Sequence, residues 1–199
     1  TSSQGNDLRG TIEVQTTHDD DFIGFVLGYN AGDLTNANAD YLLIDWKQTS
    51  QTANYVGASK EGLAISRVTG VLGHNPGSWA HDSAYNVTEL ARADSLGSTG
   101  WKDTTEYTFG LTFTSSLVEV FVDGVKELSV SGNFADGGFG FYGSSQPDVR
   151  YAGLTSNALP EQLNTRVVAP AAVPLPASLP LLLVGLGGFA ALRRRKRAS

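Results

Sequence analysis

Two segments near the start of the chain, HDDDFIGFVLGY (residues 18–29) and YLLIDWKQ (residues 41–48), show the pattern that most later segments repeat. Each contains a short run rich in β-branched and aromatic residues, and a polar loop separates the two. Such runs are typical of β-strands, so we predict strands at 22–29 and 41–48. Three consecutive carboxylates repel one another unless water or a cation screens them, which places the acidic triplet Asp19, Asp20 and Asp21 on a loop or rim.

The second predicted strand has two different faces, because successive side chains of a strand point to opposite sides. One face is apolar and carries Leu42, Ile44 and Trp46. The other is mixed and carries Tyr41, Leu43, Asp45 and Lys47. We therefore expect an acidic rim beside a half-buried sheet.

Most of the remaining chain up to residue 155 also predicts strands. Short alternating or β-branched runs occur at 11–17, 63–68, 106–114, 117–122, 125–130, 137–142 and 149–154. Asp123-Gly124 is a strong hairpin signal, because both turn residues must accept a positive φ. Residues 86–94 fit a strand or a short helix, and we expect loops at 49–62 and 70–85 and a poorly ordered start at 1–10. Many short strands without a long helix predict an all-β sandwich or jelly roll.

The charge is unevenly distributed along the 199 residues. Five of the 14 basic residues lie at 193–197, which leaves nine basic against 20 acidic residues in 1–192, a net charge of −11. So acidic a body argues against nucleic-acid binding, which needs Lys and Arg to displace phosphate counterions. The absence of cysteine excludes disulfides and thiolate metal sites. There is no methionine either, so we expect that the start of the chain has been removed.

The composition changes near residue 156, and we assign 156–172 to a linker and 173–199 to a separate C-terminal segment. Residues 167–192 carry no charge and could span a bilayer core of about 30 Å if helical. Four prolines interrupt the first half of this run, so we expect the hydrophobic transmembrane helix at 181–192. The basic cluster Arg193, Arg194, Arg195, Lys196 and Arg197 would stay on the cytoplasmic side and place the sandwich outside.

Several motifs within residues 11–154 resemble the thrombospondin C-terminal domain. They are DDDFIGFVLGY at 19–29, WKQ at 46–48, GWKD at 100–103, GFY at 140–142, SQ at 145–146 and VRY at 149–151. The resemblance implies an extracellular, calcium-binding domain of concanavalin-A-like jelly-roll fold that is associated with cell adhesion. It also implies further strands upstream, so we expect residues 1–155 to form an N-terminally truncated domain.

The C-terminal segment resembles a bacterial sorting signal. Val173, Pro174, Leu175, Pro176 and Ala177 are followed by an apolar run and then by the basic cluster. This order is similar to the VPLPA variant of the PEP-CTERM signal. Such a signal implies a Gram-negative bacterial protein that an exosortase, a membrane peptidase, recognises and cleaves near the motif. An ordinary membrane anchor is the alternative.

The acidic triplet is the first candidate functional site. Calcium takes about six to eight oxygen ligands from carboxylates, carbonyls and water, and the family resemblance favours Asp19, Asp20 and Asp21 as Ca²⁺ ligands. Adjacent residues of an extended strand cannot all face one ion, so the backbone must bend or one carboxylate must turn away. A solvated acidic turn is the alternative. Four loop aspartates could complete the site: Asp33, Asp40, Asp103 and Asp136.

Other residues have both structural and functional interpretations. Asp45 could bind a ligand on an open sheet, but we expect it to pair with Lys47 or with a base on a neighbouring strand. Trp79 and Tyr85 could stack on a sugar ring or plug their loop. We assign Trp46 and Trp101 to core or turn packing. Three histidines lack metal-binding spacing and are interpreted as loop residues: His18, His74 and His81.

Concanavalin-A-like folds also include glycosidases, which need two carboxylates about 5–10 Å apart. Glu119 and Asp123 have a suitable spacing, but Asp123 belongs to the predicted turn. We therefore predict a non-enzymatic, calcium-dependent, lectin-like protein of the cell envelope, outer surface or matrix, which recognises a glycan or a matrix protein. A carbohydrate-active enzyme and a purely structural matrix component are the alternatives.

Overall fold

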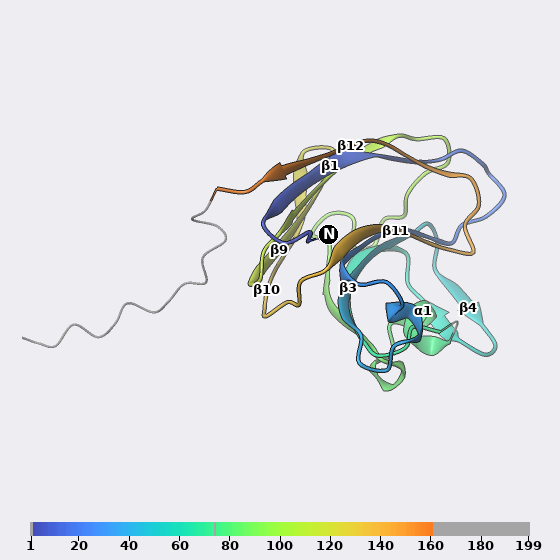
Figure 1. The fold of residues 1–199 in the computed structure, drawn as a ribbon. Coiled ribbons are helices and arrows are strands. Elements are labelled where there is room, and N and C mark those ends of the chain that lie inside the picture. Colours follow the sequence, from blue (N-terminus) through green and yellow to red (C-terminus); the bar gives the residue numbers. More distant parts are fainter. Residues whose placement is uncertain (1, 74, 161–199) are drawn as a thin grey trace, which may run out of the picture. The chain divides into compact units, whose positions relative to one another are not determined.

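The computed structural model describes residues 2–73 and 75–160, which form a sandwich of two five-stranded antiparallel sheets. Figure 1 shows β1 and β12 in one layer and β3 and β11 in the other. The first sheet, in spatial order, consists of β10 (Val125–Ser131), β9 (Leu117–Val122), β8 (Tyr107–Phe113), β1 (Asn6–Val14) and β12 (Val149–Ala158). The second consists of β11 (Gly138–Ser144), β2 (Phe22–Tyr29), β3 (Asp40–Lys47), β6 (Gly62–Thr69) and β7 (Val87–Arg92). The predicted all-β sandwich is confirmed.

Several short elements join these strands. They are η1 (Asp33–Thr35), the two-stranded sheet of β4 (Gln51–Ala53) and β5 (Gly57–Ser59), α1 (Pro76–Ala80) and η2 (Ser83–Tyr85). Figure 1 shows α1 and β4 on the outer side of the layer that contains β3. These elements therefore cover the face of the second sheet that points away from the first.

The core lies between the two sheets and follows the predicted alternation. In the β2–β3 pair, Ile23 lies opposite Trp46 and Phe25 opposite Ile44. These side chains pack in one cluster with residues of β8 such as Phe109. The apolar face predicted for β3 is therefore the inner face of the sandwich, where its burial contributes about 1.5–3 kcal/mol for each large side chain.

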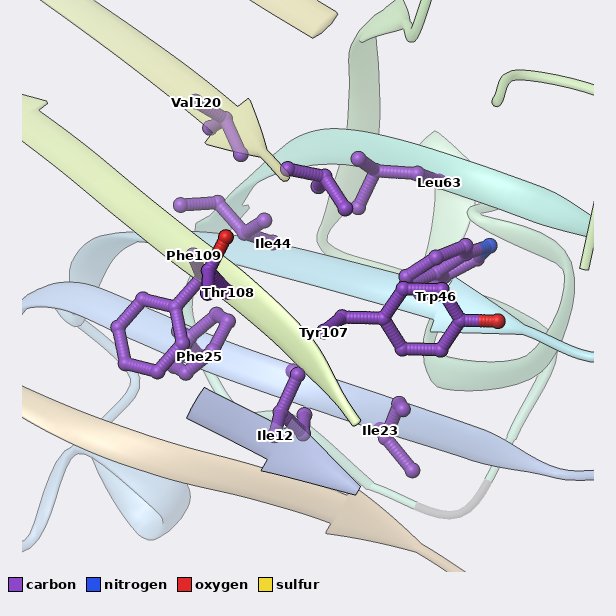
Figure 2. A pocket seen from close by; sticks show the side chains of 12 residues that line it. Ile12, Ile23, Phe25, Ile44, Trp46, Leu63, Tyr107, Thr108, Phe109 and Val120 are labelled. Carbon is purple, nitrogen blue, oxygen red and sulfur yellow. The ribbon is translucent and has the colours of Figure 1, made fainter. Parts of the chain in front are cut away.

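Figure 2 shows the middle of this core, with the ring of Tyr107 beside that of Trp46 and Phe25 beside Phe109. The ring centroids of these two pairs are 4.8 and 4.3 Å apart. A cavity of about 20 Å³ remains among them, lined mostly by apolar side chains. It has room for about one water molecule and few polar groups to hold it, so it is a packing void and not a ligand site.

The outer face of β3 is buried as well, which differs from the half-buried sheet expected. Tyr41, Leu43, Asp45 and Lys47 are each no more than 2% exposed. Tyr41 and Leu43 pack in a second apolar cluster that includes Val87, and Trp79 of α1 packs on Phe22 of β2. The charged residues of this face are therefore enclosed, and they need partners inside the protein.

Four boundary predictions need correction. Residues 2–10 are not poorly ordered, because β1 begins at Asn6 and the side chain of Ser3 donates to the carbonyl of Gly137. The expected loop at 49–62 contains the β4–β5 hairpin, and the loop at 70–85 contains α1 and η2. Within residues 86–94, where a strand or a short helix was expected, the structure has the strand β7 (Val87–Arg92). β12 continues to Ala158, past the predicted domain end at 155. Pairing with strands distant in sequence orders β1, β7 and β12. The β4–β5 hairpin and α1 are local elements, and Asn75 caps the start of α1.

Within the described residues, no helix is long and apolar enough to cross a membrane. The hydrophobic helix predicted at 181–192, the sorting motif at 173–177 and the basic cluster at 193–197 all lie outside those residues.

Candidate functional site

The acidic triplet lies where the chain enters β2. Ligand oxygens of Asp19, Asp20 and Asp21 come within 4.8 Å of one another, and Asp21 is buried while the other two are partly exposed. The pairing of β2 with β3 fixes this position, since the backbone N–H of Gln48 donates to the carbonyl of Asp20. A divalent cation could bridge oxygen atoms at such spacing.

Lys47, the last residue of β3, is the cationic partner of Asp21. Its side chain is fully buried, and its Nζ lies 2.8 Å from Asp21 Oδ1 and donates to the carbonyl of Asp20 at 3.1 Å. It also donates to Gln51 Oε1 at 2.8 Å. The Nζ lies 4.8 Å from the ring centre of Trp79, a cation–π contact. The sequence led us to expect that Asp45 pairs with Lys47 or with a base on a neighbouring strand. Lys47 pairs with Asp21 instead, and the basic partner of Asp45 is His81, which follows α1 and does not lie on a strand.

Asp20 is held by polar neighbours, and Asp19 has the fewest hydrogen bonds of the three aspartates. The hydroxyl of Thr49 and the side-chain amide of Gln51 both donate to Asp20. Asp19 Oδ1 accepts only a bond of 3.0 Å from the backbone N–H of Asp20 among the described residues. The triplet is therefore divided between one carboxylate fixed by a lysine and two that remain near the surface.

Of the four aspartates considered as additional ligands, only Asp103 is linked to the triplet. Its Oδ1 accepts from the side chain of Gln48, the residue whose backbone bonds to Asp20. Three others are engaged elsewhere: Asp33 with Asn30 and Asn36, Asp40 with Arg67, and Asp136 with Ser2 and Gln4. The structure does not bring those three to the acidic triplet.

A second charged cluster lies beside α1, and the sequence analysis did not predict that its residues come together. His81 Nε2 lies 2.9 Å from Asp45 Oδ2, and His81 Nδ1 lies 2.9 Å from Glu89 Oε2. His81 lies in the loop that follows α1, as expected, but its side chain is only 6% exposed and lies between two carboxylates, which the sequence did not predict. Burial lowers the pKa of His81, but the two carboxylates outweigh that effect and raise it to about 10. His81 is therefore a buried cation at neutral pH.

Trp79 and Tyr85, the two proposed ligand-binding aromatics, occupy different environments. Trp79 is 8% exposed, its indole N–H donates to the carbonyl of Gly57 at 3.1 Å, and its ring meets Phe22 edge-on. Tyr85 is 45% exposed at the end of η2. His18 is exposed, and His74 lies outside the described residues.

The tryptophans and carboxylates that the sequence assigned to packing or to a turn occupy such positions in the structure. Trp46 and Trp101 are both buried in the core, and the indole of Trp101 donates to the carbonyl of Asp21 at 3.0 Å. Asp123 Oδ1 accepts from the backbone N–H of Thr108 at 2.8 Å, and Glu119 pairs with Lys126 at 3.0 Å. As expected from the sequence, Asp123 belongs to the β9–β10 turn, which its side chain ties to β8, while Glu119 pairs across the hairpin with Lys126.

Comparison with known proteins then decides the family, because residues 1–158 match the thrombospondin C-terminal region. The chain belongs to the thrombospondin C-terminal family. This thrombospondin C-terminal domain is 28% identical over 120 residues to thrombospondin-3b of Danio rerio. It is 29% identical over 116 residues to cartilage oligomeric matrix protein of Rattus norvegicus. These matches cover 56% and 54% of the chain but only 12% and 14% of those two proteins.

A solved structure and a second motif complete the comparison. The carbohydrate-binding module CBM66 of Bacillus subtilis superimposes on 79% of the chain, and on 78% of its own length, with a TM-score of 0.55 and 8% identity. This likeness shows the jelly-roll fold alone. Residues 172–197 match the PEP-CTERM protein-sorting motif. The domain and the motif together identify an exported protein of the cell surface or the extracellular space.

Proposed function

We propose that this protein is a calcium-binding, lectin-like module that serves adhesion or matrix assembly and has no enzymatic activity. The observation that carries the proposal is the acidic triplet, whose ligand oxygens come within 4.8 Å of one another at the rim of the sandwich. The family supports the same conclusion, since one relative bears the name of an oligomeric matrix protein.

Calcium would be held chiefly by Asp19 and Asp20, because these two carboxylates remain partly exposed. Asp21 is already neutralised by Lys47 at 2.8 Å, so its role is to fix the backbone that carries the other two. The remaining ligands would be water and backbone carbonyls, which calcium accepts readily. The proposed site is therefore open to solvent, and binding would rigidify the entry to β2.

Recognition of a glycan or a matrix protein is assigned to the loops at the rim, where Trp79 and Tyr85 are the candidate contacts. Tyr85 offers an exposed ring, whereas Trp79 is almost completely buried. The alternative is a purely structural matrix component without a ligand. A glycan array on the purified protein separates the two interpretations, because an array without binding would favour the structural component.

The C-terminal motif supports sorting by an exosortase in a Gram-negative bacterium. The membrane would hold the unprocessed chain through residues 181–192 with 193–197 inside the cell, and cleavage would occur near 173–177. Replacing Pro174 and Pro176 by alanine should leave the full-length form in the membrane fraction. Normal processing of that variant would contradict the assignment.

The alternative of a carbohydrate-active enzyme finds little support in the carboxylates of the described residues. Asp45 and Glu89 flank His81, yet Asp45 is 1% exposed and cannot touch a sugar. Glycoside hydrolysis needs two carboxylates that both reach the glycosidic bond. Release of reducing sugar from a polysaccharide by the purified protein would reverse this conclusion.

Terbium luminescence tests the proposed calcium site directly. The indole of Trp101, bonded to the carbonyl of Asp21, lies close enough to the triplet to sensitise a bound lanthanide. We expect terbium emission that calcium abolishes by competition and that Asp20→Asn weakens. Asp94→Asn is the matched control, because Asp94 is an exposed aspartate outside the triplet. Equal emission from wild type and Asp20→Asn would overturn the proposed site.

A further inference from the structure

A polar cavity of about 140 Å³ lies beside α1, and none of the three aspartates of the acidic triplet lines it. Two aromatic and four charged side chains dominate its lining: Phe22, Trp79, Lys60, His81, Glu89 and Arg92. They come from β2, the β5–β6 turn, α1 and β7, so elements far apart in sequence build the cavity. Neither the family match nor the proposed calcium site assigns it a ligand.

Two cations contact the carboxylate of Glu89, and a third lies near it. His81 Nδ1 lies 2.9 Å from Glu89 Oε2, and Arg92 Nε lies 3.2 Å from Glu89 Oε1. Lys60 is close enough to contribute to lowering the pKa of Glu89, after the larger effects of His81 and Arg92. One carboxylate cannot neutralise three cations, and Asp45, behind His81, neutralises only one more. The cavity therefore keeps one positive charge in a chain body that is otherwise strongly acidic.

Arg92 is held in place by its neighbours and keeps unused donors. Its Nη1 donates to the carbonyls of Glu61 and Gly97 at 2.7 and 2.6 Å. Its Nε is buried and has no aligned acceptor despite the nearby Glu89. A guanidinium has five N–H donors, and Nη2 has no hydrogen bond to the described residues. Lys60 is exposed and forms no ion pair with them either.

We propose that this cavity binds the carboxylate of an acidic saccharide unit, with Arg92 and Lys60 facing the charge and the side chain of Trp79 forming an apolar wall. A hexuronate combines the two features that the lining requires, one negative charge and an apolar ring face. The buried His81 cannot lose its proton easily, so the cavity stays positive through the neutral range. This inference rests on the proposed function in one respect: the acidic saccharide is taken to belong to a matrix glycan.

The test measures binding of glucuronic acid to the full-length chain in mild detergent by saturation-transfer NMR and calorimetry. Glucose serves as the neutral sugar, and N-acetylglutamate serves as an acid without a sugar ring. We expect glucuronic acid to bind more tightly than either, and its affinity to fall with added salt because screening weakens ion pairs near the surface. Lys60→Gln should weaken its binding about fivefold, the effect of one partly exposed charge pair.

Lys126→Gln is the matched control, because Lys126 is an exposed lysine on the first sheet, paired with Glu119. Lys60 is exposed, so its replacement should leave the fold intact, which near-ultraviolet circular dichroism can verify. Equal binding of glucose or N-acetylglutamate, an equal loss in Lys126→Gln, or no binding of glucuronic acid would each overturn the proposal. The measurements are repeated in EDTA: failure of the calcium site would leave this binding unchanged, so the two proposals fail separately.

Discussion

Lys47 Nζ lies 2.8 Å from Asp21 Oδ1, and the two side chains are 0% and 8% exposed. The pair connects β3 to the chain just before β2, and aromatic rings of Phe22 and Trp79 enclose the ammonium group. Removing one member of a buried ion pair leaves the other charge without compensation, which costs more than the pair itself contributes. Lys47 therefore has two effects: it stabilises the fold, and it competes with any cation for Asp21.

Lys47→Met separates these two effects. Without calcium we expect this variant to lose about 3–5 kcal/mol of unfolding free energy, because Asp21 remains buried without a cation. We also expect it to bind calcium about tenfold more tightly, since a positive charge beside the site has been removed. Urea unfolding in EDTA and calcium calorimetry measure the two changes. Lys126→Met, at an exposed pair, should change neither; weaker calcium binding in Lys47→Met would contradict the placement of the ion.

The buried His81 predicts a pH dependence of stability. Its pKa is about 10 in the folded chain and about 6.5 in the unfolded chain. A group whose pKa is raised on folding stabilises fully below its unfolded pKa, and this contribution is lost as the pH rises from about 6.5 to 10. We expect the unfolding free energy of the wild type to fall over this interval. In His81→Gln it should be lower at pH 7 and should fall less; parallel curves would show that His81 does not carry the effect.

Gly24 has a steric role in the β2–β3 pair. A Cβ at this position would lie 2.0 Å from the backbone carbonyl of Ile44, which cannot move without breaking the strand pairing. Gly24→Ala should therefore cost about 2–4 kcal/mol in urea unfolding. Gly110→Ala in β8 is the matched control, since its Cβ would meet only ordinary contacts at 3.5 Å. Similar losses in both variants would refute the clash.

The strands were predictable because their composition and period are local properties. The faces of β3, the strands at 22–29 and 117–122 and the hairpin at Asp123-Gly124 all follow from neighbouring residues. In the structure Asp123 has φ 49° and Gly124 has φ 79°, as the turn requires. The motifs that resemble the thrombospondin C-terminal domain added the jelly-roll fold, which alternation alone does not determine.

The partners of the buried charges were not predictable, because they depend on register and on elements distant in sequence. Lys47 reaches Asp21 since Phe22 pairs with Lys47 in the β2–β3 ladder, and a shift of one residue would have reversed its face. His81 meets Asp45 only because α1 folds over the second sheet, and 36 positions separate the two. The signal available in the sequence was the composition of β3, where Asp45 and Lys47 stand among apolar residues. Charged side chains on such a strand need partners inside the protein if both faces are buried.

The most direct test of the account is thermal unfolding of the protein in EDTA and across a calcium titration. A ligand that binds only the folded state at about 100 times its dissociation constant adds about 2.7 kcal/mol, which should raise the midpoint by about 5–10 °C. We predict that calcium produces this rise, that Asp19→Asn and Asp20→Asn reduce it, and that Asp94→Asn preserves it. A midpoint that stays constant up to millimolar calcium would contradict the proposed site and leave the acidic triplet as a solvated turn.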